Sequence, residues 1–125
     1  ELSLASGTDV TASFTPHLLP QNRGIFATIY AKGSAATVLA TLQEQFANER
    51  FVHVLPMGEV PATRHARGSN MCLIGVKADR ALGRVIIIST LDNLMKGASG
   101  QAVQNANLML GLDEAAGLEF APMFP

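Results

Sequence analysis

The run "RVIIISTL", residues 84–91, constrains the fold more than any other stretch of this sequence. Four consecutive apolar β-branched residues, Val85 to Ile88, put apolar side chains on both faces of a strand, because successive side chains point to opposite faces. Such a strand belongs inside a sheet, with a helix on one face and more protein on the other. The preceding run "MCLIGVKA", residues 71–78, joins it across "DRALG", the length of a hairpin connection.

The rest of the chain adds short strand candidates and two helices. Strands are expected at 10–14, 24–31, 51–55, 71–78 and 84–91, and helices at 34–48 and 98–111. Ser34 can cap the first helix, and Val38, Leu39, Leu42 and Phe46 give that helix one apolar stripe. The pattern predicts an α+β fold: a mixed, largely antiparallel sheet with helices mainly on one face. One sheet face is then left needing a cover.

Composition limits the partners of this single domain. The chain has 125 residues, of which 48% are hydrophobic and only 15% charged, with a net charge of −1. These values favour neither nucleic-acid binding nor disorder, and no apolar run approaches the roughly 18 residues of a membrane span. A single cysteine excludes an internal disulfide and fits a cytoplasmic setting. The low charge indicates a surface partly covered by another domain or subunit, and a start at Glu1 suggests a fragment.

Two loops combine arginine, histidine and small polar residues. The first, "TPHLLPQNRG", contains His17 and Arg23. The second, "PATRHARGSN", contains Arg64, His65, Arg67 and Ser69. Arginine forks, hydroxyls and exposed backbone N–H groups are what a phosphate or carboxylate ligand requires. The alternative is a pair of solvated loops with unrelated charges, and spacing alone does not separate the two.

The remaining nucleophile and metal candidates are interpreted as structural. Cys72 shares a strand face with Ile74 and Val76, and nothing in the local sequence lowers its pKa, so we expect a core residue rather than a nucleophile. His53 alternates with apolar neighbours inside a strand and is expected to be structural. Three histidines without a matching cysteine or acidic cluster do not predict a metal site.

The helix near the C-terminus carries amides where most surface helices carry charges. Its expected core stripe is Ala102, Val103, Ala106, Met109 and Leu110. Its second face carries Gln101, Gln104 and Asn105. The preceding segment, Lys96 to Gly100, is expected to offer free backbone donors and small residues that let a large group approach. This face predicts a neutral hydrogen-bonding partner, such as a cofactor amide or a neighbouring domain, and an ordinary solvated helix is the alternative.

Four segments resemble the C-terminal part of the N-acetyl-gamma-glutamyl-phosphate reductase family: "FTPHLLPQNRGIFATIYA", "PATRHARGSNMCLIG", "RVIIISTLDNLMKGASGQAVQNANLMLGLDE" and the terminal "GL…P". That family is similar in fold and chemistry to aspartate-semialdehyde and glyceraldehyde-3-phosphate dehydrogenases. The resemblance implies reduction of N-acetyl-L-glutamyl 5-phosphate to the semialdehyde with NADPH, in arginine biosynthesis. It also implies a thiolate that attacks the acyl phosphate, a thioester that accepts a hydride, and a histidine acid/base.

The sequence lacks the family's glycine-rich dinucleotide fingerprint and its glycine–cysteine nucleophile motif, and the catalytic histidine motif is expected upstream of Glu1. The resemblance therefore implies that residues 1–125 are a C-terminal substrate-binding and dimerisation part, without the NADP-binding Rossmann domain and without a catalytic residue. The implied substrate contacts are Arg64, His65, Arg67, Ser69, His17 and Arg23. The implied cofactor contacts are Gly97, Ala98, Ser99, Gly100, Gln101 and Asn105.

The partners implied by this resemblance are N-acetyl-glutamyl phosphate, NADPH, the protein's own nucleotide-binding domain, and further copies in a dimer or tetramer. Two other functions stay open. The chain can be a binding or assembly module that kept the fold without the chemistry, or part of a related semialdehyde dehydrogenase. Acetylated and free acyl phosphates would separate the two enzymes.

Overall fold

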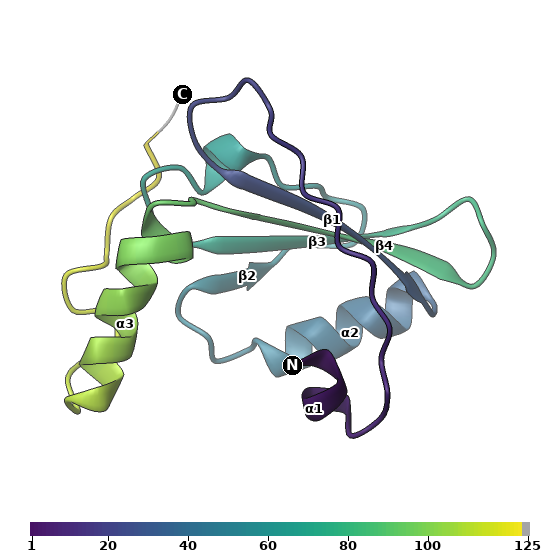
Figure 1. Cartoon of the computed structure of the whole chain (residues 1–125), viewed down its shortest axis with the longest axis horizontal. Helices are drawn as coiled ribbons and strands as arrows, with labels where there is room; N and C mark the ends of the chain where they lie inside the picture. The colour runs from purple at the N-terminus through teal and green to yellow at the C-terminus, as the bar shows by residue number, and fades with distance from the viewer. Residues whose placement is uncertain (124–125) are drawn as a thin grey trace.

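The computed structural model describes residues 1–123. Its elements are α1 (Leu2–Ser6), β1 (Ile25–Lys32), α2 (Ala35–Gln45), β2 (Val52–Val54), the 3-10 turn η1 (Thr63–His65), β3 (Cys72–Ala78), β4 (Arg84–Leu91), the π-helical turn η2 (Met95–Ser99) and α3 (Gly100–Met109). The strands form one sheet in the order β1-β4-β3-β2 (Figure 1). β4 pairs antiparallel with β1 and β3, and β2 pairs parallel with β3. The mixed α+β sheet and the interior position of β4 are as predicted.

Helix α2 covers one face of the sheet (Figure 1). The Ser34 side chain caps it by accepting a hydrogen bond from the backbone N–H of Thr37 at 3.1 Å, as its sequence position predicted. Leu39 packs against Val76 and Val85 in the buried cluster between helix and sheet. This apolar cluster holds α2 in place, because it removes the helix stripe and the strand side chains from water together.

The opposite face is partly covered by the loop that follows β2. A side chain at Gly75 would meet the backbone oxygen of Glu59 at 2.5 Å and Pro61 Cδ at 2.8 Å, so the loop lies directly on β3. Pro61 and Ile88 are buried there. Towards β1 the cover ends, and Phe26 and Tyr30 are 45% and 61% exposed. The long loop therefore supplies part of the cover that the sequence required, and an apolar strip stays open.

Strand register brings three distant segments to one end of the sheet. Leu91 at the end of β4 pairs with Ile25 at the start of β1 and with Cys72 at the start of β3. The loop before β1, the loop before β3 and the segment after β4 therefore meet at this end. These are the segments that carry the arginines and the "DNLMKGASG" stretch.

The expected strand at 10–14 is wrong. These residues have no regular secondary structure and are exposed, because no neighbouring strand among the described residues pairs with their backbone. A short helix, α1, precedes them and was not predicted. Helix α3 begins at Gly100 rather than residue 98, since residues 95–99 adopt the π-helical turn η2 that leads into it.

The expected core stripe of α3 is also wrong. The helix buries Gly100, Gln104 and Asn107, while Met109 is 86% exposed and the other predicted stripe residues are exposed as well. Helix α3 stands beyond the end of the sheet instead of on its face (Figure 1), so a polar stripe meets the polar loops there. Its apolar stripe faces outward.

Candidate functional site

A pocket at this end of the sheet collects arginines from both loops. It has a volume of about 170 Å³. Its lining residues are Gln21, Asn22, Arg23, Thr63, Arg64 and Arg67. Arg23 comes from the loop before β1, whereas Arg64 and Arg67 come from the turn η1 and the residues after it. Three of the six predicted substrate contacts therefore share one pocket, although more than 40 positions separate Arg23 from Arg64 in the sequence.

Close backbone approach explains why the two loops meet. Gly24 has a φ of 110°, a conformation that L side chains rarely adopt. A Cβ at this position would lie 2.9 Å from the Thr63 Cβ, so a larger residue would push the loops apart. The Gly24 backbone N–H also donates to Asn93 Oδ1 at 2.7 Å, which ties the loop to the segment after β4.

Asp92 lies behind the arginines and is fully buried. Its Oδ1 accepts hydrogen bonds from the backbone N–H groups of Leu94 and Met95 at 2.8 and 3.0 Å. Its Oδ2 accepts from the backbone N–H of Gly68 at 2.6 Å and lies 2.6 Å from Arg23 Nε. The Arg23 N–H is not well aligned with this oxygen, so the contact is an ion pair rather than a directed hydrogen bond.

These contacts keep Asp92 ionised. Burial alone would raise its pKa, but the Gly68 N–H, the Arg23 guanidinium and the N–H groups of Met95 and Leu94 favour the charged form. The net effect is a pKa below the usual range for aspartate. The pocket thus holds three guanidinium groups against one buried carboxylate, an excess of positive charge that suits an anionic ligand.

The arginines differ in how they are engaged. The Arg23 side chain is 23% exposed and its Nε faces Asp92. Arg64 Nε contacts His65 Nε2 at 3.5 Å. The Arg67 side chain makes no hydrogen bond or ion pair with residues 1–123 and lines the pocket. Among the described residues, Arg67 is therefore a pocket arginine whose guanidinium is not committed to a side-chain partner, while Arg64 is the more exposed of the two.

The other three predicted substrate contacts have different surroundings. His65 Nδ1 accepts from the backbone N–H of Ala62 at 3.2 Å, which supports the turn η1. Ser69 is buried, where its Oγ donates to the carbonyl of Ala66 at 2.8 Å. His17 is exposed, and its ring contacts the carbonyl of Thr15 at 3.1 Å. None of these three residues lines the arginine pocket.

Three of the five backbone donors that were expected to be free before α3 are engaged. The N–H groups of Gly97, Ser99 and Gly100 donate to the carbonyls of Asp92, Leu94 and Met95, as the π-helical turn requires. An anion therefore has no open donor cluster there. The reason is that η2 continues into α3, so the start of α3 is not a free helix terminus.

The predicted cofactor residues divide into exposed and buried ones. Gly97, Ala98, Ser99 and Asn105 are exposed, and Gln101 Nε2 donates to Asn105 Oδ1 at 3.0 Å. These two neighbouring amides offer donors and acceptors that fit a carboxamide group. Gly100 is buried instead. A side chain there would overlap the Asn70 Oδ1 and lie 2.9 Å from the Met95 carbonyl, so the domain's own packing explains this glycine.

Gln104 faces inward, contrary to the prediction of an outward amide face. Its Oε1 accepts from Asn70 Nδ2 at 3.0 Å and from Lys96 Nζ at 2.7 Å, and its Nε2 donates to the Glu114 carboxylate. Burial lowers the pKa of Lys96, and the carboxylates of Glu114 and Glu49 partly oppose this shift. This buried polar network attaches α3 to the loop before β3.

Asp92 and Asn70 were not recognised as site residues from the sequence, and Gln104 was assigned to the outward amide face. Asp92 offered one local signal, since a single acidic residue directly after an apolar strand marks the start of a turn. The inward direction of Asn70 and Gln104 had no local signal, because it depends on where α3 stands. Cys72 is half-buried, and its Sγ lies 3.4 Å from Ser89 Oγ.

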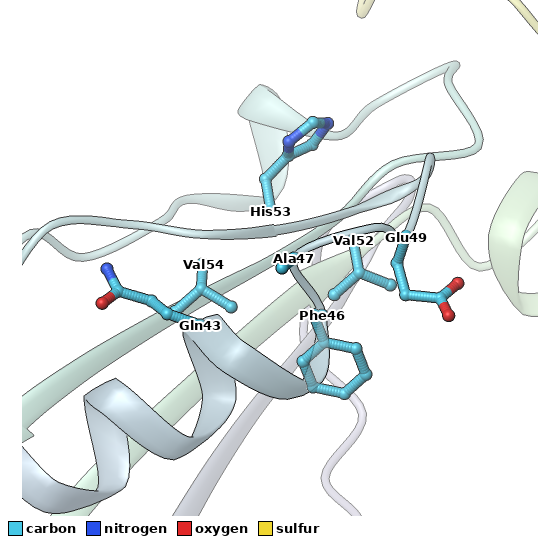
Figure 2. Close-up of a pocket in the computed structure, with 7 residues that line it drawn as sticks. All are labelled: Gln43, Phe46, Ala47, Glu49, Val52, His53 and Val54. Atoms are coloured by element: carbon cyan, nitrogen blue, oxygen red, sulfur yellow. The ribbon is translucent and has the colours of Figure 1, made fainter.

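A second cavity of about 280 Å³ lies between the end of α2 and the edge strand β2 (Figure 2). Phe46, Val52 and Val54 contribute its apolar lining, and Gln43 and Glu49 its polar lining. Figure 2 shows that the His53 side chain projects from the opposite side of β2. His53 Nε2 lies 3.2 Å from Met71 Sδ. The cavity has no cluster of polar groups aimed at one point, so it carries no catalytic arrangement.

Residues 1–123 contain no group of three or more histidine, cysteine, aspartate or glutamate side chains that could hold a metal ion. Within the same range, every helix is too short or too polar to cross a bilayer.

The fold is that of a semialdehyde dehydrogenase domain. Aspartate semialdehyde dehydrogenase II from Vibrio cholerae superposes on this chain with a TM-score of 0.56 at 24% sequence identity, over 71% of this chain and 28% of that protein. This similarity confirms the predicted fold class. Residues 1–93 match the semialdehyde dehydrogenase dimerisation domain, and the chain belongs to this family.

Curated relatives with higher identity are longer proteins. The chain is 60% identical over 125 residues to N-acetyl-gamma-glutamyl-phosphate reductase of Ruegeria pomeroyi. It is 57% identical over 125 residues to the protein of the same name from Paracoccus denitrificans. In both cases the alignment covers 100% of this chain and 36% of the relative. The chain thus spans about a third of the length of these reductases.

Proposed function

We propose that this chain is the substrate-binding and dimerisation part of an NADPH-dependent reductase. The whole enzyme converts N-acetyl-L-glutamyl 5-phosphate into N-acetyl-L-glutamate 5-semialdehyde, in arginine biosynthesis and in the cytoplasm. The observation that carries this proposal is the pocket formed by Arg23, Arg64 and Arg67, which offers an acyl phosphate the charge and the planar donors that it needs. The names of the relatives, similar over the whole chain, support the same substrate.

The role of this chain in the reaction is to bind and orient. Arg67 and Arg64 hold the substrate phosphate, and their charge stabilises the phosphate as it leaves the acyl group. Arg23 is held by Asp92 at the back of the pocket. The thiolate that attacks the acyl carbon and the histidine acid/base belong to the remainder of the enzyme. Cys72 is not that thiolate, because it lies in β3 with Ser89 as its hydrogen-bonding neighbour.

NADPH, when bound, supplies the hydride. The residues of this chain that fit it are the exposed Gly97 to Ser99 surface and the Gln101 and Asn105 amides. Neutral amides suit the nicotinamide carboxamide, since they donate and accept without a charge to desolvate. Gly100 supports this surface from the inside instead of touching the cofactor.

Two apolar surfaces support the proposed partners. The open strip of β1, at Phe26 and Tyr30, is the part of the sheet that a second copy would cover in a dimer or tetramer. The outward stripe of α3, including Val103 and Met109, is suited to the enzyme's own nucleotide-binding domain. Apolar surface of this extent on a domain with few charges indicates burial in the complete enzyme.

The test uses the full-length enzyme that contains this chain. Replacing Arg67 with methionine should raise the KM for the acyl phosphate more than about tenfold, because a charge-assisted contact contributes about 1.5–3 kcal/mol. Arg80→Met, in the β3–β4 hairpin, is the matched control and should leave KM unchanged. Kinetic constants are measured by following NADPH absorbance.

Substrate choice separates the proposed reaction from its alternatives. Turnover of the N-acetylated acyl phosphate in preference to the free acyl phosphate supports the proposal. The reverse preference identifies a related semialdehyde dehydrogenase. A folded full-length protein without turnover of either compound would identify a binding or assembly module and contradict the proposed reaction.

A further inference from the structure

The two carboxylate oxygens of Asp92 have separate partners. Oδ1 accepts both of its hydrogen bonds from Leu94 and Met95, which lie in the turn that Asp92 itself begins. Among residues 1–123, the polar partners of Oδ2 belong to the two arginine-bearing loops: the Gly68 N–H and Arg23 Nε, each at 2.6 Å. One oxygen therefore serves the local start of η2, and the other connects both sides of the pocket.

The Oδ2 contacts restrict the groups that line the pocket. A guanidinium is planar, so an ion pair at Arg23 Nε also limits where its two terminal nitrogens point. The hydrogen bond from the Gly68 N–H holds the backbone next to Arg67. Gly68 has a φ of 77°, in the left-handed region that favours glycine. Both loops lack strand or long-helix structure here, so they depend on tertiary contacts for their order, and Asp92 Oδ2 is a contact that the two loops share.

Preorganisation of this kind affects affinity. A ligand that meets arginines already held in position does not bear the cost of ordering long side chains and loops. We propose that Asp92 is the positioning residue of the arginine pocket: through Oδ2 it holds Arg23 and the Arg67–Gly68 backbone in the arrangement that binds the substrate phosphate. The inference rests on the proposed function, since it takes the pocket to be the phosphate site.

Asparagine at position 92 separates this role from a general structural one. Its amide oxygen can still accept from Leu94 and Met95, which preserves the start of η2. Its NH₂ group replaces Oδ2 and places donors against the donors of Gly68 and Arg23. The change therefore disturbs the pocket and spares the segment that leads into α3. Alanine would remove both functions.

The experiment compares Asp92→Asn with wild type in the full-length enzyme. The KM for N-acetyl-glutamyl phosphate and the dissociation constant of inorganic phosphate, measured by titration calorimetry, should each rise at least tenfold. The KM for NADPH should stay within twofold, whereas Asp92→Ala should raise it as well. Asp79→Asn is the control: it removes the ion pair with Arg84 in the hairpin and should leave both KM values and the phosphate dissociation constant unchanged.

A double variant adds a readout that a purely structural role would not produce. Because Asp92 acts in part through Arg23, Asp92→Asn combined with Arg23→Gln should weaken phosphate binding by clearly less than the sum of the two single changes in free energy. Independent, additive losses would overturn the inference. So would a folded Asp92→Asn enzyme whose phosphate affinity and acyl-phosphate KM stay within twofold of wild type.

Two further outcomes are distinguishable. If Asp92→Asn does not fold, Arg23→Gln removes the same ion pair from the other side. A phosphate dissociation constant and an acyl-phosphate KM of Arg23→Gln within twofold of wild type would also overturn the inference. If wild type binds phosphate but does not reduce the acyl phosphate, the proposed reaction fails. The ratio of phosphate affinities between wild type and Asp92→Asn then decides the role of Asp92 without turnover.

Discussion

Replacing Gly100 with alanine should destabilise this domain, although alanine is the better helix former. Gly100 has helical backbone angles, so alanine gains about 1 kcal/mol in propensity. Its Cβ, however, would lie 2.9 Å from the carbonyl carbon and oxygen of Met95 and would overlap Asn70 Oδ1. Non-bonded heavy atoms rest at about 3.5 Å or more, so η2 or Asn70 must move.

The loss of stability can be worked out from the contacts that Asn70 and Met95 make. Asn70 is fully buried, so it has no open space into which to move. Its displacement also weakens its hydrogen bond to Gln104, and such a bond contributes about 1 kcal/mol to stability. Overpacking of a filled site costs about 1–3 kcal/mol. After the propensity gain is subtracted, we expect a net loss of about 1–3 kcal/mol for Gly100→Ala.

Gly97→Ala is the matched control. It lies in η2, three residues before Gly100. Its Cβ would meet Leu91 Cδ1 at 3.3 Å, which the flexible end of that side chain can relieve, and the Asp92 carbonyl oxygen at 3.4 Å, close to an ordinary van der Waals contact. Thermal unfolding of the full-length enzyme, with hydrogen exchange of α3 amides, should show a lower midpoint and faster exchange for Gly100→Ala only. Equal or greater stability of Gly100→Ala would refute the argument that Asn70 and Met95 exclude a side chain.

Cys72→Ala in the full-length enzyme should lower the free energy of unfolding by about 1 kcal/mol, because packing and the Ser89 contact are lost, and should leave kcat nearly unchanged. A thousandfold loss of kcat with the fold intact would instead identify Cys72 as a nucleophile. Phe26→Glu should weaken the proposed self-association, because it places a charge on the open apolar strip of β1. Light scattering should show wild type at twice the chain mass or more and the variant dissociating on dilution, and a wild-type monomer at micromolar concentration would contradict the proposed dimer.

The local sequence pattern was sufficient to predict most helices and strands, but it did not predict how they pack against one another. The apolar run of β4 predicted an interior strand, and Ser34 predicted the start of α2, because both depend on neighbours within a few residues. The strand at 10–14 failed, since a strand requires a pairing partner that its own sequence does not specify. The arginine loops were recognised from composition, but which arginines share a pocket was not.

The alternation of strands and helices, the apolar faces of β4 and α2, and the two arginine-rich loops follow from the amino-acid pattern alone. The meeting of Arg23, Arg67 and Asp92 depends on the folded sheet, because the register that pairs Leu91 with both Ile25 and Cys72 joins residues far apart in the chain. The tertiary structure also decided which face of α3 is buried. A helix shows its two faces in its sequence, but which one turns inward depends on its neighbours, and here these are the polar groups of Asn70, Lys96 and Glu114.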